Sequence, residues 1–483
     1  MNEQYDVAII GAGIGGLVCG CYLAKAGLKV VIVEQHNKPG GYCTSFERQG
    51  YRFDVGVHYL GGVRSGSLKK IFEELNLNEH LKFFQFDPTD KIIMPDNILY
   101  IRAQINDTIR GFQKEFPQEK ANIKKFFDLI LNKDFLSVYS KIRRLSFVCV
   151  LDSYFRSQKL KSTLEVLMGN VGAPAEKISA ISAALLFREF LSDPGWYPEG
   201  GVQAFPETLV GILKYFKGQI FFNKKVEKII IEDYEARGII LEDGFKIRAK
   251  IVVSNADLTQ TFKKLVDIKS KERISVDALE ISPSIFSVFI GLKEGAINRI
   301  KEPATIWLTS TYNIRECYSN VNKSSDFSDP VKILICTFPF LHENNSSNKP
   351  TMELFIPAPF KTEDFWEKNR QNLMDKLIER AEKIFPNLVD YTNIKFNATP
   401  YTHYRYTLNR DGAAYGWISV PELVNRPLFL GKSSIKNLFI SGHWCNGGLS
   451  QGSISQVSVS GRTTARYIFE NLGMQWAYKH SVL

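Results

Sequence analysis

The chain has 483 residues, of which 44% are hydrophobic and 23% are charged, and its formal net charge is +10. This composition is ordinary for a globular protein, and the length favours two domains over a single core. No run of 18 apolar residues is present, which excludes a transmembrane helix by this criterion, and the first residues lack the pattern of a secretory signal.

Seven cysteines are scattered along the chain, and none belongs to a CxxC pair. This usage is typical of reduced thiols in the cytosol and argues against a disulfide framework or a zinc site. We therefore expect a cytoplasmic protein without a bound metal.

Apolar periodicity and glycine turns predict alternating strands and helices. Residues 5–10 form an apolar run that ends in glycines, as a buried parallel strand does, and a helix over 15–26 and a strand over 28–33 follow. Further helices are predicted at 69–80, over most of 110–190, at 363–385 and at 452–471, and further strands within 219–254, 285–310, 331–338 and 436–441.

The first strand, turn and helix carry a dinucleotide-binding fingerprint. Gly11, Gly13 and Gly16 fit GxGxxG, in which the first glycine permits a tight turn, the second lets the backbone approach a pyrophosphate, and the third lets the helix pack closely. The free N–H groups of the helix N-terminus attract phosphates. Glu34 ends the second strand, where its carboxylate can accept hydrogen bonds from a ribose. A glycine turn without a ligand is the alternative, and the ordered array argues against it.

Two further glycine-rich segments favour FAD over NAD, which the fingerprint alone does not separate. Residues 39–41 (Pro-Gly-Gly) follow Glu34 by a short loop, where two-dinucleotide flavoproteins place a glycine pair near the pyrophosphate. The pattern of residues 438–444 and 447–452 is typical of a strand followed by a glycine-rich turn and the start of a helix. A helix N-terminus aimed at the flavin would stabilise the negative charge of its reduced form. A cofactor held from both chain ends implies a discontinuous cofactor domain.

The chain resembles the phytoene desaturase-like flavoproteins, a family that includes bacterial phytoene desaturases, carotenoid isomerases and retinol saturases. The matching segments cover both ends and the middle, in family order: Tyr5–Gly41, Tyr51–Gly62, Trp196–Phe205, Val252–Asp257, Arg405–Tyr406, Gly412–Trp417 and Gly442–Arg462. Residues 53–62 look most like the saturase and isomerase branches. The chain departs from many relatives at His443, where they carry an acidic residue after the glycine.

The resemblance implies an α/β fold with a discontinuous Rossmann-type FAD-binding domain, built on a parallel sheet, and an inserted α+β substrate domain. We place the FAD-binding domain at residues 1–90, 195–275 and 430–475, and the substrate domain at 91–194 and 276–429.

The same resemblance implies an FAD-dependent oxidoreductase that desaturates, saturates or isomerises carbon–carbon double bonds of a lipophilic carotenoid, retinoid or isoprenoid. The inserted segments are rich in apolar and aromatic residues, although core packing explains any single one of them better: Phe126, Phe127, Phe135, Leu136, Leu185–Phe187, Phe286, Phe289, Phe338, Phe340 and Phe355. Two other classes stay open, a flavin amine oxidase-like enzyme with a smaller substrate and a non-catalytic prenyl-lipid carrier. Desaturation, saturation and isomerisation use the same site architecture, so the sequence does not reveal which of them occurs. It also leaves the substrate, the electron acceptor and the oligomeric state open.

We expect the FAD site to combine the glycine turn, the acid, the segment around His58 and the C-terminal glycine turn. The expected contacts are Gly11, Gly13, Ile14, Gly15, Gly16, Glu34, Gln35, Gly41, Tyr42, Val57, His58, Tyr59, Val226, Asn255, Gly442, His443, Gly452, Ser453 and Ile454.

His58 and His443 are the candidate catalytic residues, because the flavin itself carries hydride transfer and few titratable side chains are needed. His58 would position the substrate or relay a proton, and a protonated His443 would stabilise reduced flavin. For both, a structural hydrogen bond to the backbone is the alternative. Residues 403–406 (His-Tyr-Arg-Tyr) either line the flavin or form a solvated strand end.

Most of the excess positive charge lies between residues 110 and 161. Within residues 123–151 apolar residues recur near helical spacing, and Lys124, Lys141 and Arg144 lie between them. This pattern predicts a basic amphipathic face that associates peripherally with an anionic membrane surface. The alternative is a stripe that packs onto the substrate domain beside solvated lysines. No nucleic-acid partner is expected, because no recognised module accompanies the patch.

Overall fold

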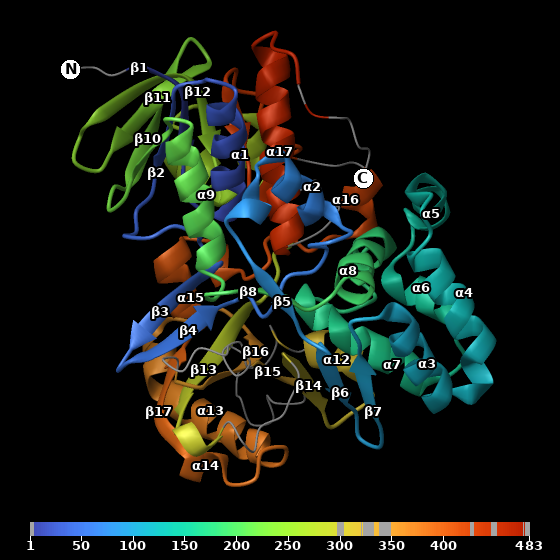
Figure 1. Cartoon of the computed structure of the whole chain (residues 1–483). Helices are drawn as coiled ribbons and strands as arrows, with labels where there is room; N and C mark the ends of the chain where they lie inside the picture. Colours follow the sequence, from blue (N-terminus) through green and yellow to red (C-terminus); the bar gives the residue numbers. More distant parts are fainter. Residues whose placement is uncertain are drawn as a thin grey trace.

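The computed structural model describes residues 4–296, 304–319, 321, 333–337, 349–425, 429–445, 452–476 and 478. Of the predicted features, Phe338, Phe340 and the glycine-rich residues 447–451 lie outside this part of the chain. Figure 1 shows an upper α/β region that contains β1, a lower region built on a second sheet, and a helical lobe at the side. The expected α/β class, with a Rossmann-type domain and an insert, is confirmed.

The first sheet joins strands from both ends of the chain. β1 (Gln4–Ile10) pairs in parallel with β2 (Val30–Val33) on one side and with β12 (Lys246–Ser254) on the other. β9 (Gln219–Phe221) continues the parallel order beside β2, and β18 (Leu438–Ile440) continues it beside β12. Every residue of β2 is buried, as expected for a parallel strand covered on both faces.

Helices and a meander cover the two faces of this sheet. α1 (Ile14–Lys25), α9 (Ala204–Tyr215) and α17 (Ile454–Asn471) lie together and share one apolar core with β1 and β2. The antiparallel strands β10 (Val226–Glu232) and β11 (Glu235–Leu241) extend the sheet beyond the first part of β12 and close a second core.

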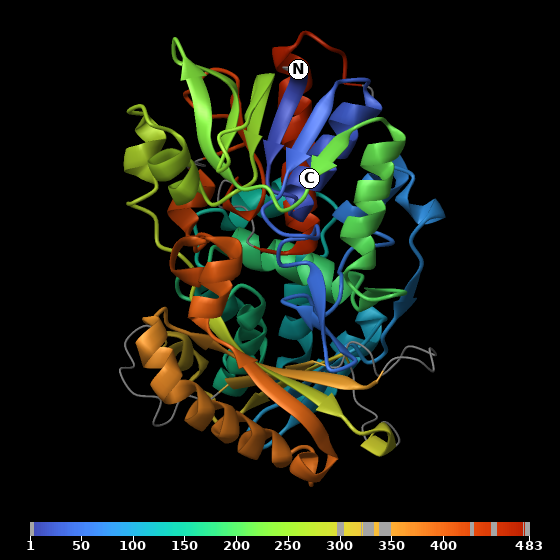
Figure 2. The ribbon, with the colours of Figure 1, turned by 90° about the vertical axis from the view of Figure 1, so that its left-hand side faces the viewer.

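The second sheet is mixed and has seven strands among the residues described. Their order is β17 (Thr392–Ala398), β13 (Ser284–Leu292), β16 (Thr351–Ala358), β15 (Ile333–Thr337), β14 (Thr305–Thr309), β6 (Asp90–Ile93) and β7 (Ile98–Ile101). Alternate side chains of each strand, such as Leu354 and Ile356, pack on α13 (Glu363–Glu382), which runs under the sheet in Figure 2. The intervening side chains, such as Phe355, face the first sheet and the helical lobe. We call this second surface the inner face.

A hairpin, β3 (Thr44–Arg48) and β4 (Tyr51–Val55), connects the two regions. Its Phe46 and Phe53 pack against Phe289 and Phe396 of the second sheet, with ring centroids 5.1 to 5.7 Å apart. A second pair, β5 (Phe83–Gln85) with β8 (Trp196–Pro198), crosses the same boundary. The remaining helices include α2 (Ser67–Glu74), α10 (Leu258–Gln260), α11 (Lys271–Ser275), α12 (Ile314–Ser319), α14 (Leu388–Tyr391), α15 (Pro400–Thr407) and α16 (Pro421–Asn425).

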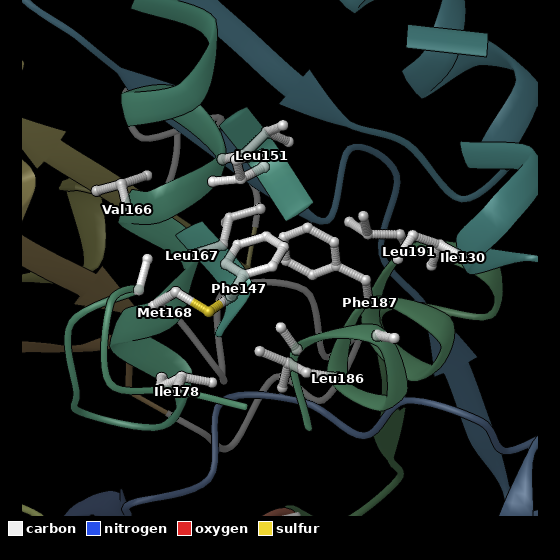
Figure 3. Close-up of a cluster of buried hydrophobic side chains, with 14 of the residues drawn as sticks. Ile130, Phe147, Leu151, Val166, Leu167, Met168, Ile178, Leu186, Phe187 and Leu191 are labelled. Carbon is white, nitrogen blue, oxygen red and sulfur yellow. The ribbon is translucent and has the colours of Figure 1, made fainter. Parts of the chain in front are cut away.

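The helical lobe comprises α3 (Ile105–Glu115), α4 (Lys120–Ile130), α5 (Phe135–Ile142), α6 (Phe147–Tyr154), α7 (Gln158–Glu165) and α8 (Ala180–Ser192). Figure 3 shows its core, in which Phe147 and Phe187 pack among leucine, isoleucine and methionine side chains. The core is apolar throughout its centre and extends to the inner face of the second sheet.

The expectation of one amphipathic face over residues 123–151 is wrong. The window contains three helices, because Asn132 and Asp134 use their side chains on backbone N–H groups and begin a new helix, α5. The apolar stripe, represented by Ile123, Phe127 and Val138, is buried in the lobe core. The stripe therefore packs onto the protein, as the alternative interpretation held.

The close packing of α1 on α17 depends on Gly461. A Cβ atom on this residue would lie 2.4 Å from the Gly15 carbonyl oxygen, so Gly461→Ala must separate the two helices. We expect the free energy of unfolding to fall by about 1–3 kcal/mol. Gly111→Ala is the matched control, because in α3 a Cβ meets nothing within 4 Å and should add up to about 1 kcal/mol. Denaturant titration measures both variants, and a Gly461→Ala protein as stable as the parent contradicts this account of the helix pair.

Candidate active site

The glycine turn after β1 is closed by contacts that only glycine permits. Gly11 has a φ of +90°, and a Cβ on Gly16 would lie 2.4 Å from the Gly11 carbonyl oxygen. Asn255, which follows β12, lies against this turn, since a Cβ on Gly13 would come 2.8 Å from its Nδ2. Gly442, which follows β18, lies on the other side of Asn255, since a Cβ on Gly442 would come 2.6 Å from the Asn255 Oδ1. Three strand ends therefore meet at the carboxyl edge of the sheet, where α/β folds bind ligands.

Glu34 joins this turn to the end of β2. Its buried carboxylate accepts hydrogen bonds from the Ala12 N–H at 2.7 Å and from the His36 N–H at 2.9 Å. The predicted glycine pair packs on the same turn, because the Gly40 N–H donates to the Ala12 carbonyl at 2.8 Å and a Cβ on Gly41 would lie 3.4 Å from the Gly13 Cα. The structure thus brings together the turn, the acid and the glycine pair that the sequence placed in one site.

This arrangement fits a dinucleotide such as FAD. α1 begins at Ile14 with no side chain capping its first N–H groups, which leaves them and their partial positive charge for a pyrophosphate. Between the turn and the second sheet, Asn255 Oδ1, Ser441 Oγ and His443 Nε2 are buried without a hydrogen-bond partner among the described residues. Buried polar atoms are normally paired, so a ligand that reaches from the turn towards His443 supplies what they lack.

Tyr42, His403 and His443 gather beside this edge. The ring of Tyr42 lies 6.0 Å from that of His403 and 6.3 Å from that of His443, and its hydroxyl donates to the Ala413 carbonyl. Burial lowers the pKa of both histidines to about 4 and raises the pKa of Tyr42 to about 12. Burial favours the neutral form of all three, because it removes the water that would stabilise a charge, and this is contrary to the protonated His443 that the sequence analysis expected.

His403 lies on the buried side of a helix, α15, whereas Arg405 and Tyr406 of the same segment are exposed. Neither sequence interpretation of residues 403–406 describes this segment, because it is helical and only one of its four side chains faces inward. The N-terminus of α15 is held by a capping box between Thr399 and Thr402, which is why the chain turns into a helix here.

His58 lies against the inner face of the second sheet. Its ring stacks on Phe355 with centroids 4.8 Å apart and planes 12° apart. Burial lowers the pKa of His58 to about 4, and its Nδ1 has no partner in the described part of the chain. The sequence included Phe355 only among many apolar residues, and the structure distinguishes it as the platform for His58.

Glu353 was missed by the sequence analysis. It lies two residues before Phe355 on β16, so both side chains point to the inner face. Burial raises the pKa of Glu353 to about 8, and the nearby negative charge of Asp54 adds to the rise. The signal that could have found it is a single carboxylate within the apolar strand 351–356 (Thr-Met-Glu-Leu-Phe-Ile).

Tyr415 was also missed as a site residue, although it lies in a segment that carries the family resemblance. A Cβ on Gly452, before α17, would lie 3.0 Å from its Cδ1, and one on Gly172, in the helical lobe, would lie 2.7 Å from its Cδ2. Burial and the negative charge of Glu353 raise the pKa of Tyr415. Tyr415 therefore joins the C-terminal turn, the helical lobe and the second sheet.

Other expected cofactor contacts lie further from this group. The Tyr59 hydroxyl donates to Asp90 at 2.8 Å, and its ring lines a small cavity between the helical lobe and the second sheet. Val226 lies in the core between β10 and β12, and Gln35 donates to the Tyr406 carbonyl at 3.2 Å. Val57 and Ile454 pack on the core around α1 and α9, and Ser453 caps α17 at the Gln456 N–H.

Known proteins are similar to this one along most of the chain. Residues 14–469 match the sequence profile of the family described as flavin containing amine oxidoreductase. A Daucus carota protein named prolycopene isomerase, chloroplastic, is 27% identical over 98% of this chain and 81% of its own length. A Danio rerio protein named all-trans-retinol 13,14-reductase is 24% identical over 91% of this chain and 82% of its own. The solved structure of a putrescine oxidase bound to putrescine has the same fold, with a TM-score of 0.67, 14% identity, and coverage of 97% and 99%.

Gly13→Val tests the glycine turn as the cofactor site. The φ of Gly13, −68°, suits any residue, so the new side chain acts only by filling the approach to the turn and displacing Asn255. We expect the purified variant to lose most of its flavin, measured by absorbance after release from the denatured protein. Gly211→Val in α9, where a Cβ meets nothing within 4 Å, should keep it. Stoichiometric flavin in Gly13→Val would overturn the assignment of the turn.

Proposed function

The chain belongs to the flavin-containing amine oxidoreductase family and is an FAD-dependent oxidoreductase, and we propose that it acts on carbon–carbon double bonds of a lipophilic polyene. The reaction is a desaturation, a saturation or a cis–trans isomerisation. The similarity over most of the chain to proteins named for prolycopene and for all-trans-retinol supports this substrate class.

The observation that carries the proposal is that the three histidines of the site and Glu353 are buried, which favours their uncharged forms. His58, His403 and His443 have a lowered pKa, about 4, and Glu353 has a raised pKa, about 8, in each case mainly through burial. A site whose histidines and acid are all uncharged near neutral pH offers no strong attraction to a charged substrate. It suits a substrate without charge.

The helical lobe supplies an apolar wall on one side of this site. Its core is continuous with Ile285, Trp307 and Phe355 on the inner face of the second sheet. A long hydrocarbon chain gains about 25 cal/mol for each Å² of apolar surface that it buries, so such walls bind a polyene without polar contacts. Figure 3 shows the packing of this core around Phe147 and Phe187.

FAD, when bound, supplies hydride transfer. The chain's own residues hold and shield it: the turn at Gly13 binds the pyrophosphate and Glu34 binds the ribose. His58, fixed by its stack on Phe355, keeps a neutral imidazole towards the site. Tyr42 packs beside His443 and Tyr415 beside Gly452, and their buried rings would exclude water from the site.

An amine substrate is the second candidate, since the family is named for amines and the putrescine oxidase shares the fold. Recognition of an ammonium group needs an ionised carboxylate or an aromatic cage open to it. In this site Glu353 is protonated near neutral pH, and the ionised Asp54 is already engaged with Ser45 and Tyr197. The site therefore favours the polyene.

Anaerobic incubation with prolycopene, all-trans-retinol and putrescine tests the proposal. We expect mass spectrometry to show a polyene that gains two hydrogens, loses two hydrogens or changes only its retention time, which separates saturation, desaturation and isomerisation. Each polyene is incubated with and without a chemical reductant, and Gly13→Val is the flavin-depleted control. Oxidation of putrescine, with every polyene unchanged, would contradict the proposal.

We further propose that the protein takes its substrate from an anionic membrane surface, on which it docks through the tip of the helical lobe. None of the helices in the described ranges is long and apolar enough to cross a membrane. At the tip, α5 buries the side that carries Phe135, Val138 and Ile142 and leaves Leu136 63% exposed. Leu145, which follows the end of α5, is 37% exposed. Lys133, Lys141 and Arg144 lie within four residues of one of these leucines along the chain and are exposed, without an ion pair to any described residue. Exposed leucines ringed by basic side chains are typical of an interfacial anchor.

Co-sedimentation with vesicles that contain phosphatidylserine tests this surface. Each basic residue near such a membrane contributes about 1 kcal/mol, so changing Lys133, Lys141 and Arg144 together to glutamine should weaken binding about 100-fold. The matched control changes Lys214, Lys368 and Arg370, which are exposed elsewhere, to glutamine and should bind like the parent. Equal binding by both triple variants, or none by the parent at low salt, contradicts docking through this tip.

A further inference from the structure

Glu353 occupies the centre of the inner face, with Phe289 of β13 opposite it on one side and Thr337 of β15 on the other. It is 6% exposed, and its strand neighbours Met352 and Leu354 point the opposite way, into the core on α13. The fold therefore directs one carboxyl group of an otherwise apolar strand towards the site, where packing alone would favour another apolar residue.

The groups that face Glu353 come from each element packed on it. They are Asp54 on the β3–β4 hairpin, Ser287 on β13 and Tyr415 before α16. His58 lies next to them through its stack on Phe355. Tyr415, whose pKa the charge of Glu353 raises, in turn lies against Gly452, which precedes α17.

Of these groups Glu353 is the best placed to hold and release a proton near neutral pH, because the other acid, Asp54, is engaged with Ser45 and Tyr197. Asp54, with a pKa raised to about 6 by burial, is ionised there and accepts hydrogen bonds from Ser45 and Tyr197. Burial raises the pKa of Tyr415 above the ordinary value of tyrosine, so this hydroxyl stays protonated. Burial lowers the pKa of His58 to about 4, so this ring stays neutral. Glu353, at about 8, keeps its proton in an apolar surrounding and can release it.

We propose that Glu353 is the catalytic acid and base of the reaction, the group that gives a proton to a carbon of the polyene or takes one from it. This inference rests on the proposed action on a polyene. In saturation the carboxyl O–H breaks and a C–H forms on one carbon of the double bond, while the hydride that completes the reduction comes from reduced FAD. In desaturation the Glu353 carboxylate would take the proton, and the hydride would pass to the oxidised FAD that the site holds when loaded. In isomerisation a proton is added and then lost, with no net oxidation.

The pH dependence follows from the raised pKa. The carboxyl group is protonated below about pH 8, so proton donation should be fast there and decline as the pH rises through this value. Proton abstraction needs the carboxylate and should rise over the same interval. A rate that falls as the pH rises through about 8 therefore indicates that proton donation limits turnover, and a rate that rises indicates that proton abstraction does.

Glu353→Gln and Glu353→Asp, with Glu272→Gln as the control, test the inference. Glu272 is a buried carboxyl far from the site that accepts from Ser434, so its change to glutamine should leave turnover unaltered. We expect Glu353→Gln to retain its flavin and lose about 10²- to 10⁴-fold in turnover, with partial recovery in Glu353→Asp. In heavy water, a parent that saturates or isomerises the polyene should place deuterium from solvent on a polyene carbon, and Glu353→Gln should not.

A second measurement does not depend on turnover. The infrared carbonyl band of a protonated carboxylic acid should persist in the parent to about pH 8 and be missing from Glu353→Gln, whereas Asp54 should titrate near pH 6. A parent that converts no polyene contradicts the proposed function. An active Glu353→Gln that keeps its rate and its deuterium transfer, or a parent without the high-pH band, overturns the role of Glu353 alone.

Discussion

The site depends on one point of contact, the place where Asn255 lies between the glycine turn and Gly442. Its side chain is so close to Gly13, Gly15 and Gly442 that a methyl group on any of them would collide with it. Because β1, β12 and β18 come from the beginning, middle and end of the chain, this contact sets the position of segments that are distant in sequence. The same contact places the start of α1 beside Gly442, because a Cβ on Gly15 would lie 2.7 Å from the Gly442 nitrogen.

Desolvation is the second constraint, and it acts on every titratable group between the two sheets. Histidines lose their protons and Glu353 keeps its proton for the same reason, that a charge is unfavourable away from water. The result is a site that contains hydrogen-bonding groups, most of which carry no charge. Such a site tolerates a hydrocarbon and still holds a carboxyl group able to exchange a proton.

In the helical lobe, one sequence pattern supplies both residues that pack in the core and apolar residues that stay exposed on the surface. The apolar positions of residues 123–151 close the lobe core, whereas Leu136 and Leu145 stay outside beside basic residues. Helical spacing cannot tell a stripe that packs on the protein from one that packs on lipid, because both need the same period. The breaks at Asn132 and Asp134 decide the matter by turning α5 to a new direction.

Local sequence alone determined the cofactor half of this protein. The order of strand, glycine turn, helix and acid is encoded within residues 5–34, and each step depends on neighbours a few positions apart, which is why the turn and Glu34 could be predicted. The choice of FAD over NAD needed the glycine segments at 39–41 and 447–452 and the family resemblance. The predicted helices and strands of both sheets were found for the same reason, since their periods are local.

Only the tertiary structure decided the chemistry of the substrate side. The neutral state of His443 depends on burial by distant segments, and the helical state of residues 403–406 placed His403 alone beside Tyr42. Glu353 and Phe355 gain meaning only when β16 enters the second sheet and His58 approaches its inner face. A sequence shows which residues can ionise, but burial and partners decide which of them do, and both arise from contacts between segments far apart in the chain.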